Sequence, residues 1–273
     1  MKSIAFGQYY PADSVMHRLD PRMKVILTVL YIVCSFLCKN IISFALLALS
    51  AVVLVVISKI PLGTVLKGLK AVFFVLLLTS VLNIFWTQGD TPLFQWKFIR
   101  VYSEGLYAAG FIIVRIASLI IGTGMFLTYT TTPIALTDAI EDLLSPLKKL
   151  HIPVHDFAMM MTIALRFIPL LVEETDKIMT AQKARGADFS SGSIIQRIKA
   201  LIPVIIPLFA SAFNRAGDLA TAMECRCYHG GEGRTRMTVR HLAPVDFAAL
   251  FLVVALGCAL VGLNIVGFGY TMA

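Results

Sequence analysis

Residues 25–58 read VILTVLYIVCSFLCKNIISFALLALSAVVLVVIS and carry a single charge, at Lys39. Lys39-Asn40 divides this stretch into two uncharged apolar runs, 25–38 and 41–58. A bilayer core is about 30 Å thick, and a helix needs about 20 apolar residues to cross it. The stretch therefore predicts a tight helical hairpin through a membrane. Its first arm is short enough that the flanking lysines are expected to extend to the headgroups.

The whole chain has the composition of an integral membrane protein. Of its 273 residues, 58% are hydrophobic and 15% are charged, with a mean hydropathy of +0.82, whereas soluble domains have about 25% charged residues. Three more runs are almost free of charge: 71–86, 106–132, which contains Arg115, and 247–273. The alternating stretch 88–104 predicts a short hairpin at the membrane interface. We expect an all-α integral membrane protein with about five transmembrane helices.

The basic residues gather on one side of these predicted spans. Four precede the first span, three lie in 59–70 and thirteen lie in 133–242, which makes 20 of the 24. Because Lys and Arg stay mainly on the cytoplasmic side, we expect the N-terminus and the long insert 133–242 inside and the C-terminus outside. The insert also carries eleven acidic residues, so it lacks the dense basic stripe of a nucleic-acid-binding protein.

We therefore expect the chain to have three parts. Residues 1–132 form a membrane part with four transmembrane helices, 133–242 form the cytoplasmic or interfacial insert, and 243–273 form a C-terminal transmembrane helix. The insert has the apolar periodicity of amphipathic helices. A short one starts at Pro133 and ends near Pro146.

Two long amphipathic helices follow in the insert. One starts after Pro153 and runs to Lys183, with a bend expected at Pro169. The other starts at Ser193, where a capping box reaches Gln196, and extends to residues 225–227. Pro203 and Pro207 are expected to kink it. Each long helix would measure about 45–50 Å, more than a bilayer crossing requires.

The two long helices end alike. The ends are Ala184-Arg185-Gly186 and Cys225-Arg226-Cys227. One interpretation is that each arginine complements the negative end of the helix macrodipole, worth about 0.3–1 kcal/mol. The other is a paired contact with a partner, because guanidinium is a permanently charged planar fork with five donors.

An N-terminal motif adds to this pattern. Residues 14–24 read SVMHRLDPRMK. With this run, the layout of the spans around a long helical insert, and Ala184-Arg185-Gly186, the chain resembles the transmembrane T component of energy-coupling factor (ECF) transporters, the EcfT/CbiQ-like family. The resemblance covers nearly the whole chain. It implies that two X-Arg-Gly motifs end the coupling helices and that each arginine enters a groove on one ATPase. The first motif matches fully, and in the second Cys227 stands where glycine is expected.

The resemblance also implies a function and partners. It implies a non-enzymatic subunit that couples two ABC-type ATPase subunits to a small hydrophobic substrate-binding membrane subunit, shared or dedicated, for vitamin or micronutrient uptake. A dedicated cobalt or nickel importer is the related alternative. No cofactor is expected in this chain, which has no Gly-x-x-x-x-Gly-Lys-Ser/Thr loop, so ATP would bind to the partners. Met159, Met160 and Met161 are either core or an adaptable contact for the substrate subunit.

Other candidate sites have simpler interpretations. Cys225, Cys227 and His229 offer three metal ligands, but a closed structural site needs four, so no metal site is predicted. The charged residues from His17 to Lys24 are interpreted as membrane anchors and topology signals.

Arg115 lies within a predicted span and is costly in lipid. We expect it to pair with the charged insert or with a backbone carbonyl. A stand-alone secondary transporter, the alternative from another functional class, would need several intramembrane ionisable residues, and only Arg115 qualifies. An intramembrane hydrolase is disfavoured because its catalytic set is missing from the sequence.

Overall fold

The computed structural model describes residues 9–86, 92–96, 99–189, 191, 193–230 and 241–266. The chain divides into two compact units. Of the described residues, those within 9–139 and 241–266 belong to the bundle unit, and those within 140–230 belong to the crossed-helix unit.

Helices make up most of the described chain. The bundle unit contains α1 (Val15–Arg18), α2 (Pro21–Leu37), α3 (Ile41–Ser58), α4 (Leu62–Trp86), α5 (Ser103–Thr123), the π-helix η1 (Gly124–Thr128) and α9 (Pro244–Val266). α6 (Pro133–Leu144) runs from the bundle unit into the crossed-helix unit. The 3₁₀ helix η2 (Ser145–Leu150), α7 (Val154–Ala184) and α8 (Ile194–Cys225) complete the latter. The predicted all-α membrane fold is confirmed.

Within the described part of the chain, six helices are long and apolar enough to cross a membrane, judged by length and composition. Four of them are predicted spans, namely α3, α4, α5 with η1, and α9. α2, the predicted first span, has 17 residues and reaches about 26 Å, just short of a bilayer core. The other two are α7 and α8, which are less apolar than these four helices.

α4 starts earlier than the sequence predicted. The uncharged run begins at 71, but the helix begins at Leu62. Lys59 ends α3 in the left-handed conformation, with a φ of 54°, and Pro61 directly precedes α4. The chain therefore reverses in a few residues, and Lys67 and Lys70 lie on α4 instead of in a loop.

The segment between α4 and α5 forms the predicted hairpin over its described residues. β1 (Pro92–Trp96) pairs antiparallel with β2 (Ile99–Tyr102), with Trp96 opposite Ile99 in the register. The predicted last span, 247–273, is described as far as 266, so its final residues lie outside the described part.

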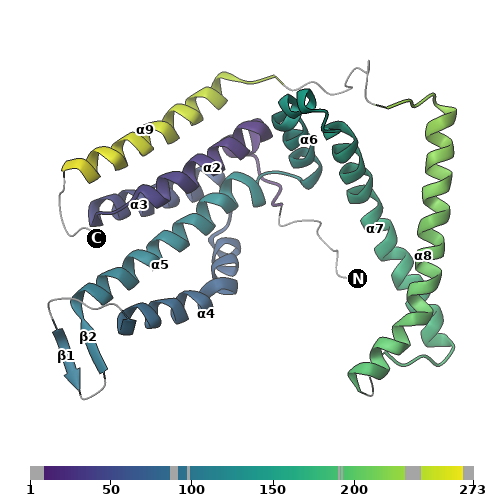
Figure 1. The fold of residues 1–273 in the computed structure, drawn as a ribbon, viewed down its shortest axis with the longest axis horizontal. Coiled ribbons are helices and arrows are strands. Elements are labelled where there is room, and N and C mark those ends of the chain that lie inside the picture. The colour runs from purple at the N-terminus through teal and green to yellow at the C-terminus, as the bar shows by residue number, and fades with distance from the viewer. Residues whose placement is uncertain are drawn as a thin grey trace. The chain divides into compact units, whose positions relative to one another are not determined.

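α2 packs against α5 and α9 inside the bundle unit (Figure 1). α3 shows how the sequence pattern positions a helix here. Phe44, Leu47, Ala51 and Val55 recur at three- or four-residue spacing and are buried. Val56, on another face, is 70% exposed. An outward apolar face of this kind is unfavourable in water and favourable against lipid.

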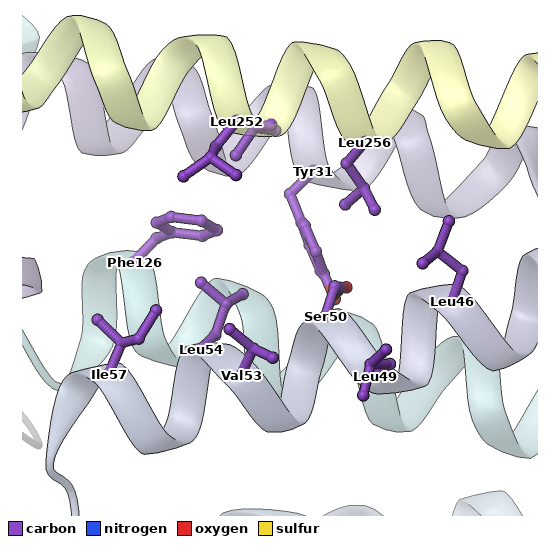
Figure 2. A pocket seen from close by; sticks show the side chains of 11 residues that line it. Tyr31, Leu46, Leu49, Ser50, Val53, Leu54, Ile57, Phe126, Leu252 and Leu256 are labelled. Carbon is purple, nitrogen blue, oxygen red and sulfur yellow. Dashed lines mark hydrogen bonds between the residues drawn. The ribbon is translucent and has the colours of Figure 1, made fainter.

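An apolar groove of about 260 Å³ opens between α2, α3 and α9. Figure 2 shows Tyr31 reaching across it toward Ser50, with Leu252 and Leu256 of α9 at its upper side. The Tyr31 and Ser50 hydroxyl oxygens lie 3.3 Å apart, and the other lining side chains are apolar. The groove therefore offers a hydrocarbon-like surface with one polar pair.

α7 and α8 pack against each other in the crossed-helix unit. They run antiparallel, because Glu174 contacts Arg215 whereas the later Gln182 contacts the earlier Pro203. Arg215 donates to Glu174 Oε2 at 2.8 Å, and Gln182 Nε2 donates to the Pro203 carbonyl at 3.3 Å. That carbonyl is available because Pro207, four residues later, has no N–H to bond with it. The contact thus uses the backbone acceptor that the second proline frees.

The boundaries of the two long helices follow the predicted signals. Ser193 N–H donates to Gln196 Oε1 at 3.0 Å, which confirms the capping box at the start of α8. Pro169 lies inside α7, and Pro203 and Pro207 lie inside α8. Figure 1 shows α8 changing direction in its first half, as expected for these prolines.

Candidate functional site

α7 ends in a Schellman motif with Arg185 as its C-cap residue. Gly186 N–H donates to the Lys183 carbonyl and Ala187 N–H to the Gln182 carbonyl, both at 3.0 Å. Gly186 has a φ of +89°, a region that favours glycine because it has no Cβ. The backbone of Arg185 is therefore held in a defined helix end.

α8 ends in the same motif, with Arg226 as its C-cap residue. Cys227 N–H donates to the Glu224 carbonyl at 2.9 Å and Tyr228 N–H to the Met223 carbonyl at 3.0 Å. Cys227 takes the left-handed position with a φ of 55°, a conformation that costs an L-residue about 1–2 kcal/mol. Cysteine in place of glycine thus keeps the helix end at the expense of local strain.

The two arginines occupy equivalent and accessible positions. Arg185 and Arg226 are both exposed, as are the flanking residues Ala184, Gly186, Cys225 and Cys227. Within the part of the chain that the structure describes, neither guanidinium forms a hydrogen bond or an ion pair. Both guanidinium groups are therefore exposed next to the negative end of a helix.

The two helix ends lie far apart because the helices are antiparallel. The Gln182–Pro203 hydrogen bond places the end of α7 beside the first third of α8. Arg226 lies 23 residues beyond Pro203, which corresponds to about 35 Å along a helix. Arg185 and Arg226 therefore do not form one shared site.

The methionine run lies on the first half of α7. Met160 and Met161 are each 53% exposed, whereas Met159 is half-buried. Phe157 on α7 and Phe213 on α8 are also exposed. Met160 and Met161 are therefore not core residues of this chain alone, and a contact with a substrate subunit stays a prediction.

Cys225 and Cys227 are exposed free thiols. Among the residues described, no group of three or more His, Cys, Asp or Glu is arranged to hold a metal ion. The cluster with His229 therefore gives no geometric support for a metal site.

Arg115 pairs with a backbone carbonyl, one of its two predicted partners. Its Nη2 donates to the Cys38 carbonyl at 2.9 Å, and its Cζ lies 5.2 Å from the centre of the Phe44 ring. Cys38 is the C-cap of α2, so this carbonyl is one of the acceptors that a helix end leaves unsatisfied. Arg115 therefore ties α5 to the turn between α2 and α3.

Two charged residues of the N-terminal run, Asp20 and Lys24, are buried in the bundle unit. Asp20 Oδ1 accepts from Arg22 N–H at 2.9 Å and caps α2. Lys24 is only 1% exposed, and its Nζ donates to the Thr130 carbonyl at 2.8 Å and to Thr131 Oγ1 at 3.3 Å. The expectation that this flanking lysine extends to the headgroups is wrong, because its ammonium finds acceptors just after η1.

Asp246 is the buried residue that the sequence interpretation missed. It is 1% exposed, and its carboxylate accepts from Asp20 N–H at 2.8 Å and from Ala243 N–H at 2.7 Å. An acid in the first turn of α9 after Pro244 is a local signal for the second bond. The bond to Asp20 spans 226 residues, and no local pattern predicts it.

These observations define a multi-pass all-α membrane protein with two long helices that carry matching, exposed arginine ends. The family model described as CbiQ, cobalt transport protein, matches residues 12–237. The energy-coupling factor transporter transmembrane protein EcfT of Clostridium kluyveri is 51% identical over 259 residues, 94% of this chain and 96% of the relative.

Two further relatives have the same name. EcfT of Bacillus subtilis is 50% identical over 236 residues, 86% of this chain and 89% of the relative. EcfT of Streptococcus equi is 42% identical over 257 residues, 94% of this chain and 95% of the relative. The chain therefore belongs to the CbiQ/EcfT family of transmembrane components of energy-coupling factor transporters, and the resemblance drawn from the sequence is confirmed.

Proposed function

We propose that this chain couples ATP hydrolysis by two cytoplasmic ABC-type ATPase subunits to the movement of a separate substrate-binding membrane subunit. The observation that carries the proposal is the pair of matching helix ends. Each end presents an exposed arginine without a partner in the described chain, and the two ends are separated along an antiparallel helix pair. One ATPase would bind each end.

The chemistry of the helix ends supports this role. A guanidinium donates in a fixed fork, so it binds carboxylates or carbonyls in a groove with a defined direction. The Schellman hydrogen bonds fix the backbone of Arg185 and Arg226 relative to the last turn of each helix. A displacement of an ATPase groove would therefore move the whole helix.

The substrate-binding subunit would dock on the apolar surface of the same helices. Met160, Met161, Phe209 and Phe213 are between 53% and 74% exposed, and apolar surface of this kind is typical of protein or membrane contacts. Methionine repacks easily, which would let several interchangeable subunits use one surface. We propose vitamins or similar micronutrients as the substrates, with the N-terminus and insert on the cytoplasmic side and the C-terminus outside.

A dedicated cobalt or nickel importer is the alternative within the family, because the matching family model is described as a cobalt transport protein. Uptake of labelled Co²⁺ or Ni²⁺ by cells that contain or lack this chain separates the two. No cofactor of its own is needed in either case, since ATP would bind to the ATPases.

A stand-alone secondary transporter is less well supported. Arg115, the intramembrane candidate from the sequence, donates to a helix-end carbonyl and lies over an aromatic ring. These contacts support a structural role for it. Substrate uptake by liposomes that contain this chain alone would favour that rival and refute the coupling role.

The direct test is purification of the tagged full chain from membranes in mild detergent. The wild type should retain two ATPases and a small hydrophobic membrane subunit. The double variant Arg185→Glu/Arg226→Glu should lose the ATPases. The control Lys177→Glu/Lys199→Glu changes the net charge equally at two exposed positions on the same helices, and it should retain them. Equal ATPase recovery from both variants would overturn the proposal.

A further inference from the structure

A second pocket of the bundle unit lies between α4 and the end of α5 with η1. It has a volume of about 530 Å³. α4 and α5 pack side by side (Figure 1). Unlike the groove in Figure 2, this pocket has both a polar and an apolar wall. The coupling role proposed above does not involve this pocket.

The polar wall is rich in free donors. Lys67, Thr64, Thr128 and Tyr129 line the pocket. Within the described chain, the Lys67 ammonium and the three hydroxyl groups form no hydrogen bond or ion pair. No acidic side chain is among the described residues that line the pocket. The wall therefore suits an anion.

The inner side of the pocket is formed by the closely packed ring of Tyr129. Tyr129 is 5% exposed, and its ring is seated against two glycines. A Cβ on Gly68 would lie 2.8 Å from the Tyr129 hydroxyl oxygen, and a Cβ on Gly124 would lie 2.9 Å from the ring. Tyr10 N–H donates to the Tyr129 carbonyl at 3.0 Å and fixes the N-terminal segment there. Gly124 belongs to η1, and π-helical turns often occur at functional sites.

The apolar wall lies deeper along both helices. Ala71 follows Lys67 by one turn on α4, and Ile120 precedes the pocket residue Thr123 by one turn on α5. Both helices are candidate membrane spans, so the apolar wall faces the bilayer core and the polar wall faces its surface. The basic residues near this end predict that the surface is the cytoplasmic one.

We propose that this pocket binds one anionic phospholipid of the cytoplasmic leaflet. Its phosphate lies against Lys67 and the neighbouring hydroxyl groups, and an acyl chain follows Ala71 and Ile120 between α4 and α5. Basic pockets between transmembrane helices on the cytoplasmic side have this chemistry. A soluble phosphate would use only the polar wall and would leave the apolar wall empty.

The test is native mass spectrometry of the full chain released from nanodiscs made of equimolar phosphatidylcholine and phosphatidylglycerol. The wild type should retain one phosphatidylglycerol. Lys67→Gln should lower its retention about fivefold, from the loss of one lysine contact. Lys70→Gln, which removes the same charge from α4 outside the pocket, should retain it as the wild type does. Ala71→Leu, at an exposed position that tolerates a larger side chain, should lower retention with all charges intact.

Three results would overturn the proposal. Equal loss in Lys67→Gln and Lys70→Gln would show a general charge effect. Unchanged retention in Ala71→Leu would show that no acyl chain occupies the pocket. Displacement of the lipid by inorganic phosphate alone would show a site for a soluble anion.

Discussion

Replacing Cys227 with glycine should tighten the end of α8. Cys227 is held at a φ of 55° by the Schellman hydrogen bonds of that helix end. Glycine removes about 1–2 kcal/mol of left-handed strain from the closed helix end. It also stabilises the open state, in which the Schellman hydrogen bonds are broken, by about 0.4–1 kcal/mol of chain entropy. The closed helix end is therefore stabilised by about 0.5–1 kcal/mol in total, which corresponds to a two- to fivefold smaller population of the open state.

Hydrogen exchange of the Tyr228 amide measures this population, because that N–H bonds the Met223 carbonyl at 3.0 Å. Its exchange should slow two- to fivefold in Cys227→Gly. The matched control is Gly186→Ala at the end of α7, where a Cβ meets nothing within 4 Å. The φ of +89° alone should make the Ala187 amide exchange faster there. Faster exchange at Tyr228 in Cys227→Gly would refute the assignment of strain to this residue.

Three further predictions concern buried or paired charges, each measured by the unfolding of the purified full chain. Arg115→Ala should lower the free energy of unfolding by about 2 kcal/mol, because it removes a charged donor from a helix-end carbonyl. Arg115→Lys should recover part of this loss. An unchanged unfolding transition in Arg115→Ala would contradict the structural role. Asp246→Asn should lower the free energy of unfolding by about 1–3 kcal/mol, because one amide oxygen replaces two carboxylate oxygens that each accept a backbone N–H. An unchanged free energy of unfolding would show that the carboxylate is dispensable. A double-mutant cycle on Glu174 and Arg215, which are 26% and 35% exposed, should give a coupling energy of about 0.5–1 kcal/mol, and zero coupling would mean that the pair does not stabilise the helix crossing.

Local signals in the sequence predicted most of the helical framework. Pro153 and the Ser193–Gln196 capping box mark the starts of α7 and α8, because both act on the residues next to them. The start of α4 was missed for a physical reason. The predicted span begins where the charged residues end. The helix itself also includes Lys67 and Lys70, because their long side chains can reach the membrane surface.

The sequence shows that both long helices end at an arginine, but it does not show that the two ends share one backbone geometry. The position of Arg185 follows from Gly186, a common helix terminator. Cys227 carries no such signal, so only the backbone shows that both helix ends adopt one motif. Long-range contacts were also beyond the sequence. The burial of Lys24 depends on acceptors more than 100 residues away, and the capping pattern around Asp20 does not reveal Asp246.

The most direct test of the coupling role is the stoichiometry of ATPase subunits in the purified complex, measured by native mass spectrometry. The wild type should carry two ATPases per copy of this chain. Arg185→Glu and Arg226→Glu should each carry one, and the double variant should carry none, since the two helix ends are separate binding sites. Two ATPases retained by the double variant would contradict the account.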